Sequence, residues 1–331
     1  MTLVCVLGSG IIGLASATAL VEAGFEVVVV ARDLPGDPGG LAWASPSAGA
    51  VIQPLPEGEG HDLQVESLKY YWALAHRDPT AGAQTLPVTE YYDSYEDDSS
   101  HWYRSVCPRY RRLRKDELPE GVTVGVTMTT VMVNTTIFLP WLQKNLESRG
   151  VKFIRHAATS IPEVLEKTQA AVIVNATGLG AGKLCNDAAV HPVKGQTMFL
   201  RNDTEWNEIL LRKGTEYTYV IPRTATGGVI LGGIRLDGDI DDKPDPTVQR
   251  DILRRVNKLT KGAFEHVNIE TDVDDIVGVR PGRKGGYRLE TEGSRVVHAY
   301  GFDGMGYVCS FGAAKRVTEL VKELVPPESK L

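Results

Sequence analysis

The chain has 331 residues, of which 42% are hydrophobic, enough for one large or two ordinary domains with a proper core. Its 36 Lys and Arg against 42 Asp and Glu give a net charge of -6, which argues against partners that carry phosphate backbones or anionic lipid. The longest apolar runs, such as 25–31, are far shorter than the roughly 20 residues that cross a bilayer, so we expect a soluble globular protein that binds neither nucleic acid nor membrane.

The first 31 residues predict a βαβ unit with parallel strands. Residues 3–7 and 25–31 are apolar runs of strand length, and the Ala- and Leu-rich segment 14–23 predicts a helix that ends before Gly24. Because the sequence starts directly on the first strand, without a basic segment or a cleavage site, we expect no signal peptide.

Gly8, Gly10 and Gly13 lie between this strand and this helix in the spacing GxGxxG. Such glycines allow a tight turn, a close approach of backbone to a pyrophosphate and close packing of helix on strand, while the helix N-terminus offers N–H groups to the phosphates. Asp33 follows twenty residues after Gly13, a spacing typical of an acid that binds ribose. The motif predicts a dinucleotide site and does not separate NAD from FAD.

The rest of the chain alternates between helical and strand patterns. The stretch 35–60 is rich in Gly, Pro and Ser and predicts a loop over a ligand. The remaining periodic segments predict helices at 63–76, 138–149, 248–259 and 313–324, and strands at 122–133, 151–155, 170–175, 217–222, 229–233 and 296–300. The strands between 198 and 277 favour an antiparallel sheet.

This order predicts an α/β protein with a discontinuous Rossmann-type nucleotide-binding domain. We assign residues 1–50, 150–195 and 279–331 to that domain. The remaining segments, 51–149 and 196–278, form an inserted, mainly antiparallel β domain that we expect to bind the substrate.

The cysteines and histidines give no sign of a metal site. The four cysteines lie far apart without a CxxC pair and read as buried free thiols, and the seven histidines show no paired spacing. We therefore expect no metal. The sequence does not decide whether the protein is a monomer or a homo-oligomer.

Six segments spread along nearly the whole chain carry a shared resemblance: 8–13, 31–35, 44–50, 174–178, 195–196 and 300–302. In this order they resemble the family of D-amino-acid oxidase and D-aspartate oxidase. Ser47 stands where fungal relatives often carry Trp, and Asp303 where Gly or Ser is usual. The resemblance implies that the dinucleotide is FAD, contacted by Gly8, Gly10, Ile11, Ile12, Gly13, Arg32, Asp33, Ala44, Ser45, Gly49, Ala158, Thr177, Gly178, Arg280, Asp303, Gly304, Gly306, Tyr307 and Val308. Because no cysteine has a context that would link a flavin, we expect FAD to be bound noncovalently.

The resemblance also implies how a substrate is held. Segment 277–281 resembles the motif that carries an arginine for the substrate α-carboxylate, so the candidate is Arg280, and segment 218–222 resembles the motif that carries a tyrosine, so the second candidate is Tyr219. The planar fork of an arginine suits both oxygens of a carboxylate. The carbonyl of Gly304 and the side chain of Gln53 are candidates for contacts around the substrate amine.

Arg212 and Arg235 occupy places where D-aspartate oxidases carry arginines for the distal carboxylate, so the closest resemblance is to D-aspartate oxidase. The implied reaction passes a hydride from the substrate Cα to the flavin, after which the imino acid hydrolyses to a 2-oxo acid and ammonia and dioxygen is reduced to hydrogen peroxide. A broad oxidase of neutral D-amino acids is an alternative. An NAD-dependent dehydrogenase and a non-catalytic nucleotide-binding protein are two others.

The sequence ends in Ser329-Lys330-Leu331, the tripeptide of a peroxisomal address that an import receptor reads. Two prolines precede it and leave the tail extended. We therefore expect a peroxisomal protein.

Overall fold

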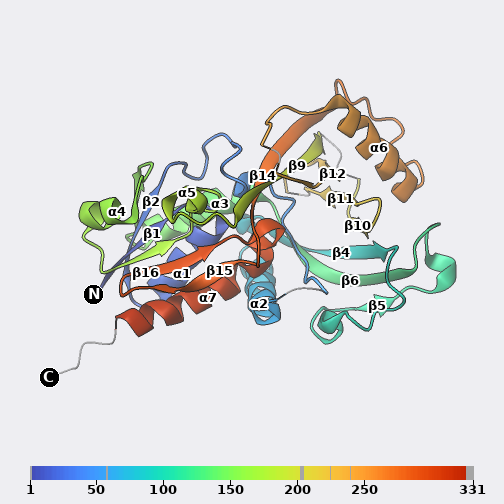
Figure 1. The fold of residues 1–331 in the computed structure, drawn as a ribbon. Helices are drawn as coiled ribbons and strands as arrows, with labels where there is room; N and C mark the ends of the chain where they lie inside the picture. The colour runs from blue at the N-terminus through green and yellow to red at the C-terminus, as the bar shows by residue number, and fades with distance from the viewer. Residues whose placement is uncertain (1, 57–58, 202–204, 224, 239, 326–331) are drawn as a thin grey trace.

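The computed structural model describes residues 2–56, 59–201, 205–223, 225–238 and 240–325. Two sheets form its framework (Figure 1). The first sheet has six described strands, which are parallel except for its edge strand β15. In their order across the sheet these strands are β15 (Arg288–Glu292), β16 (Val296–Tyr300), β8 (Val172–Asn175), β1 (Leu3–Leu7), β2 (Glu26–Ala31) and β7 (Lys152–Arg155).

Helices cover both faces of this sheet, as expected where parallel strands are buried on both sides. The apolar side chains of β1 and β2 alternate between two clusters, one of which packs toward α4 (Ile161–Thr168) and α5 (Gly180–Leu184). The other face packs against α1 (Ile11–Glu22) and α7 (Gly306–Leu324). The result is a three-layered nucleotide-binding fold.

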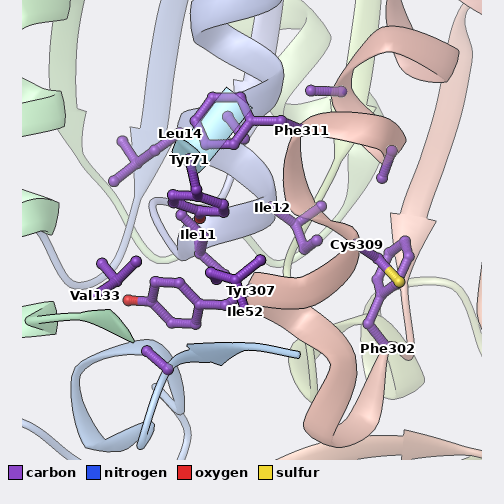
Figure 2. Packing of buried hydrophobic residues seen from close by; sticks show 14 of the residues in the cluster. Ile11, Ile12, Leu14, Ile52, Tyr71, Val133, Phe302, Tyr307, Cys309 and Phe311 are labelled. Carbon is purple, nitrogen blue, oxygen red and sulfur yellow. The ribbon is translucent and has the colours of Figure 1, made fainter. Parts of the chain in front are cut away.

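Helices α2 (His61–Arg77) and α3 (Thr135–Ser148) pack on the outside of α1 and α7. Figure 2 shows Tyr71 of α2 among Leu14 and Phe311 in this layer. The Tyr71 hydroxyl lies 3.0 Å from Ser310 Oγ. A Cβ at Gly312 would lie 2.2 Å from the Leu63 carbonyl oxygen, so the glycine permits the close approach of α7 to α2.

The second sheet is mainly antiparallel. Its longest described path joins, in order across the sheet, β13 (Leu236–Asp237), β9 (Val190–Leu200), β12 (Val229–Gly232), β11 (Thr218–Pro222), β10 (Ile209–Lys213), β4 (Ala83–Tyr92), β6 (Val124–Val133) and β3 (Val51–Ile52). Two more strands pair beside this path: β14 (Val273–Arg283) with β9, and β5 (Arg111–Arg112) with β6. Helix α6 (Pro246–Thr260) covers one face (Figure 1). Short 3₁₀ turns lie at Ser45–Ser47, Pro79–Ala81, Trp102–Ser105, Lys115–Glu117 and Asp303–Met305.

The predicted fold class is confirmed, and the predicted strands and helices are present with small shifts of their ends, except that α7 begins seven residues before the predicted start at 313. The predicted domain boundaries after 195 and 278 fall inside β9 and β14, because these two long strands pair with each other along their whole length. The domain division itself stays a prediction. The tripeptide Ser329-Lys330-Leu331 lies outside the described residues.

Three of the cysteines, Cys5, Cys107 and Cys309, are buried free thiols, and Cys185 is partly buried. Burial raises the pKa of each of the three buried thiols to about 12. They are therefore protonated at neutral pH and act as small apolar side chains. In the described ranges no helix is both long enough and apolar enough to cross a bilayer.

Candidate active site

A cavity of about 670 Å³ lies between the glycine turn of the first sheet and one face of the second sheet. This volume is in the range of pockets that enclose organic ligands. Every residue that the sequence assigns to the cofactor lines the cavity, except Gly13. Of the residues assigned to the substrate, Arg280, Tyr219, Gly304 and Gln53 line it, and Arg212 and Arg235 do not.

The glycines of the turn are needed because the backbone passes close to itself. A Cβ at Gly13 would lie 2.0 Å from the Gly8 carbonyl oxygen, and a Cβ at Gly8 would lie 2.5 Å from the oxygen of Ala176. Gly8 also has a φ of +112°, which L side chains rarely adopt. Gly13 therefore allows α1 to pack closely against the backbone of Gly8, while Gly8 and Gly10 line the cavity.

The first turn of α1 opens onto the same space. Gly10 precedes the helix in an extended conformation without a side-chain cap, and the Ile11 N–H donates to Ser45 Oγ at 3.0 Å. The N-terminal N–H groups of a helix have no partner within the helix and attract anions. This end of α1, with no side chain at Gly10 to fill the space, fits the diphosphate of a dinucleotide.

Arg32 and Asp33 follow β2 and line one end of the cavity together with Ala158. Arg32 Nε donates to Asp33 Oδ2 at 2.8 Å, and the Ser9 hydroxyl donates to the backbone oxygen of Asp33. Thr177 lies at the end of β8, where its hydroxyl donates to Asn175 Oδ1 at 2.7 Å. These ends of parallel strands are where doubly wound folds bind nucleotides.

The N-terminus of α7 borders the middle of the cavity with Gly306, Tyr307 and Val308. The Tyr307 hydroxyl donates to the Ser45 carbonyl at 3.0 Å, and burial raises the pKa of Tyr307. This phenol therefore fastens the loop that carries Ser45 to α7. Gln53 is buried beside the cavity and its Nε2 has no hydrogen-bond partner among the described residues.

Arg280 extends from β14 and lines the same cavity. Its Nη1 makes only long contacts, 3.4 Å to the Lys194 carbonyl and 3.5 Å to the Ile234 carbonyl, and it forms no ion pair within the described ranges. A Cβ at Gly195 would lie 2.8 Å from both terminal nitrogens, so that glycine makes room for the guanidinium. A cation without an acidic partner on a cavity wall suits a carboxylate ligand.

Tyr219 of β11 lies on the same wall and is 6% exposed. A Cβ at Gly232 would lie 2.2 Å from its ring, and a Cβ at Gly233 would lie 2.5 Å from its hydroxyl oxygen, so the two glycines make room for this side chain. Burial raises the pKa of Tyr219. The phenol is therefore protonated at neutral pH and can donate to an anionic ligand.

Arg212 lies on the opposite face of the second sheet. Successive side chains of a strand point to opposite faces, so Leu211 and Lys213 of β10 line the cavity and Arg212 points away. Its Nη1 lies 3.4 Å from Glu216 Oε2, and its Nη2 lies 3.9 Å from Asp93 Oδ2. This geometry contradicts the expectation that Arg212 contacts the substrate, because the side chain points away from the cavity.

Arg235 lies beside the cavity wall rather than on it. Its side chain is 47% exposed, and its Nη1 donates to Oδ2 of the cavity residue Asp303 at 2.7 Å. Its Nη2 also lies 3.2 Å from Asp237 Oδ1. Arg235 can reach the cavity only by giving up or sharing its bond to Asp303.

The sequence interpretation missed Lys213 and Tyr217, which both line the cavity. Lys213 follows Arg212 in β10, so its side chain points to the opposite face of the sheet. The interpretation assigned Arg212 to the substrate and therefore chose the face of β10 that points away from the cavity. Tyr217 precedes β11 and has the same parity as Tyr219, so the alternation of β11 could have indicated it.

The chain matches the model of the family described as FAD dependent oxidoreductase over residues 4–320. It is 30% identical to a D-amino-acid oxidase of Fusarium vanettenii, with 97% of both chains covered. It is 29% identical to a D-aspartate oxidase of Talaromyces thermophilus, with 96% of this chain and 94% of the relative covered. Among solved structures, a glycine oxidase from Geobacillus kaustophilus has the same fold, with a TM-score of 0.78, 19% identity and coverage of 98% and 95%.

These matches extend over nearly the full length of the chain and agree with a cavity whose lining fits both a dinucleotide and a carboxylate. They also decide between the two dinucleotides in favour of FAD. The chain belongs to the family of FAD-dependent oxidoreductases that includes D-amino-acid oxidase and D-aspartate oxidase.

Proposed function

We propose that the protein oxidises acidic D-amino acids, D-aspartate and D-glutamate, to the 2-oxo acid and ammonia, with dioxygen reduced to hydrogen peroxide. The observation that carries the proposal is the guanidinium of Arg280, which lines the cavity without an acidic partner in the described chain. An amino acid brings a carboxylate to such a group.

Arg280 and Tyr219 hold the α-carboxylate in this proposal. The arginine supplies charge and two parallel donors, and the protonated phenol supplies a third. Gly304 and Gln53 line the same cavity and offer oxygen acceptors to the substrate amine. Bound FAD supplies the acceptor for the hydride from the substrate Cα. The protein holds this carbon in one orientation, which also selects one enantiomer.

The acidic side chain of the substrate requires a further positive group, and Arg235 is the nearest candidate that the sequence identified. A charge-assisted hydrogen bond contributes roughly 1.5 to 3 kcal/mol. Arg235 is half exposed and bonded to the cavity residue Asp303, so it would have to share or give up this bond to reach a substrate.

A broad oxidase of neutral D-amino acids is the second candidate function. The ion pairs of Arg235 with Asp303 and Asp237 favour this candidate, because they already neutralise the cation. The relatives include both a D-amino-acid oxidase and a D-aspartate oxidase.

A peroxide assay of the purified holoenzyme on a panel of D- and L-amino acids tests the proposal. We expect peroxide with D-aspartate or D-glutamate and none with their L enantiomers. Peroxide formed mainly from D-alanine or D-valine supports the neutral oxidase instead. Absence of peroxide with every amino acid contradicts both.

We also propose that Ser329-Lys330-Leu331 carries the protein into peroxisomes, where its peroxide would be contained. The support is the tripeptide itself, which is a receptor-read address. An N-terminally tagged protein should be imported, and the same protein without the tripeptide should stay in the cytosol. Import without the tripeptide contradicts the proposal.

A further inference from the structure

The cavity wall of the second sheet carries a cation that the proposed function has not used. In the parallel pairing of β10 with β4, Leu211 lies opposite Glu90 and Lys213 lies opposite Tyr92. In the antiparallel pairing with β11, Leu211 lies opposite Tyr219. Residues that lie opposite one another in a sheet share a face. Lys213 is therefore on the same face as Tyr219, and both line the cavity.

An acid and a phenol lie beside the Lys213 ammonium. Its Nζ is 3.9 Å from Glu90 Oε2, donates to the Tyr92 hydroxyl at 3.4 Å and lies 5.3 Å from the centre of the Tyr92 ring. Glu90 is 0% exposed and Tyr92 2%, whereas the Lys213 side chain is 23% exposed. The Glu90 carboxylate is thus fully buried, and the Lys213 side chain lies between it and the cavity.

The carboxylate of Glu90 is held in one orientation. Its Oε2 accepts hydrogen bonds from Tyr92 at 2.5 Å and from Tyr103 at 3.2 Å, while its Oε1 has no partner among the described residues. Burial raises the pKa of Glu90, and the charge of Lys213 acts in the opposite direction. A buried carboxylate is costly unless a cation lies close to it, so Glu90 and Lys213 depend on each other.

We infer that Lys213 determines the specificity for the distal carboxylate of the substrate, and that Glu90 and Tyr92 are positioning residues that hold its ammonium on the cavity wall. This inference rests on the proposed function and identifies a cation on the wall that carries Tyr219. Arg280 binds the α-carboxylate, and Lys213 binds the group at the other end of an acidic side chain. Arg235 has the smaller role, because it lies beside the cavity wall and Lys213 lies on it.

The test compares kcat/KM for D-aspartate and D-alanine in the holoenzyme and in Lys213→Met, which keeps an unbranched side chain one atom shorter and removes its charge. We expect the variant to lose about ten- to hundred-fold on D-aspartate, the factor of one charge-assisted hydrogen bond, and to keep or improve its rate on D-alanine. Lys213→Arg should restore part of the loss. Lys258→Met removes a charge from α6, outside the cavity lining, and should leave the ratio unchanged.

Glu90→Gln tests the positioning role. The amide keeps the size of the side chain, so we expect KM for D-aspartate to rise with kcat nearly constant, and no change of KM for D-alanine. Equal losses on both substrates would show a merely structural role and overturn this part of the inference.

Binding of malonate, a dicarboxylate without an amine to oxidise, gives a second readout through the visible spectrum of the bound flavin. Lys213→Met should weaken malonate about ten- to hundred-fold and acetate little. Because this measurement needs no turnover, it also tests a variant whose kcat is too low to measure.

The outcomes separate the inference from the proposed function. A wild type that prefers D-aspartate, with an unchanged ratio in Lys213→Met, overturns the inference and leaves the function standing. A wild type without acidic preference, in which Lys213→Met still selectively impairs D-aspartate, overturns the proposed preference and supports the role of Lys213. No preference and no selective effect overturn both.

Discussion

Arg235 and Asp303 form an ion pair of 2.7 Å at the edge of the cavity, between the segment after β12 and the loop before α7. Asp303 adopts a φ of +51°, a conformation that a residue other than glycine adopts at some cost, and its Oδ1 has no partner among the described residues. The Asp303 carboxylate thus accepts from Arg235 the hydrogen bond that the distal carboxylate of a substrate would accept. An acidic substrate has to compete with Asp303 for this cation.

Replacing Asp303 by glycine should therefore release Arg235. We expect kcat/KM for D-aspartate to rise relative to D-alanine by about tenfold, because one competing charged hydrogen bond is removed. Steady-state kinetics on both substrates measure the ratio. Asp237→Asn removes the exposed partner of Arg235 and should have a smaller effect. A ratio unchanged by Asp303→Gly means that Arg235 does not contact the substrate.

Replacing Arg280 by methionine should impair every amino-acid substrate alike, because each carries the α-carboxylate. The loss of a charged, forked donor predicts a decrease in kcat/KM of about hundred-fold or more on D-aspartate and D-alanine. Because Arg280 is also an expected FAD contact, each rate is divided by the flavin content, which absorbance of the purified variant measures. A loss confined to D-aspartate would place Arg280 at the distal carboxylate instead.

Replacing Gly13 by alanine should destabilise the nucleotide-binding turn. The new Cβ meets the Gly8 backbone oxygen at 2.0 Å, which no side-chain motion relieves, and overpacking of this kind costs about 1–3 kcal/mol. We expect a lower Tm and reduced flavin content, with the remaining flavin released by acid because it is bound noncovalently. Gly40→Ala is the control, since a Cβ there meets nothing within 4 Å. Full flavin content and an unchanged Tm in Gly13→Ala would contradict the close contact.

His101 should make the protein less stable in mild acid. Its side chain is 0% exposed, its Nδ1 bonds to the Tyr110 hydroxyl at 2.8 Å, and burial lowers the pKa of His101 from 6.5 to about 4. The unfolded chain therefore takes up a proton below pH 6.5 that the folded protein refuses until about pH 4. The free energy of unfolding should fall across this window, and the fall should be smaller in His101→Phe. Parallel pH profiles of wild type and variant would contradict this role.

The sequence predicted those parts of the site that lie in local motifs. The glycine turn, the segment that carries Tyr219 and the segment that carries Arg280 each keep their residues within a few positions, and the fold brings them to one cavity. Local motifs did not predict which alternate side chains of β10 face the cavity. The face is set by pairing with β4, a strand about 120 residues earlier in the sequence that was itself missed, in part because Pro87 interrupts its pattern.

The same reason explains the difference between Arg212 and Lys213. A shift of one residue along a strand exchanges the two faces of a sheet, so a resemblance that locates a position to within one residue does not tell which side chain meets the ligand. The partner of Arg235 was equally hidden, because Asp303 lies 68 residues further along the chain.

The ratio of kcat/KM for D-aspartate to that for D-alanine, measured by oxygen consumption of the FAD-loaded wild type, tests the central claim most directly. We expect a ratio of about ten or more, the factor that one charged hydrogen bond to the distal carboxylate provides. A ratio of one or less, with D-alanine oxidised readily, would contradict it and identify the protein as an oxidase of neutral D-amino acids.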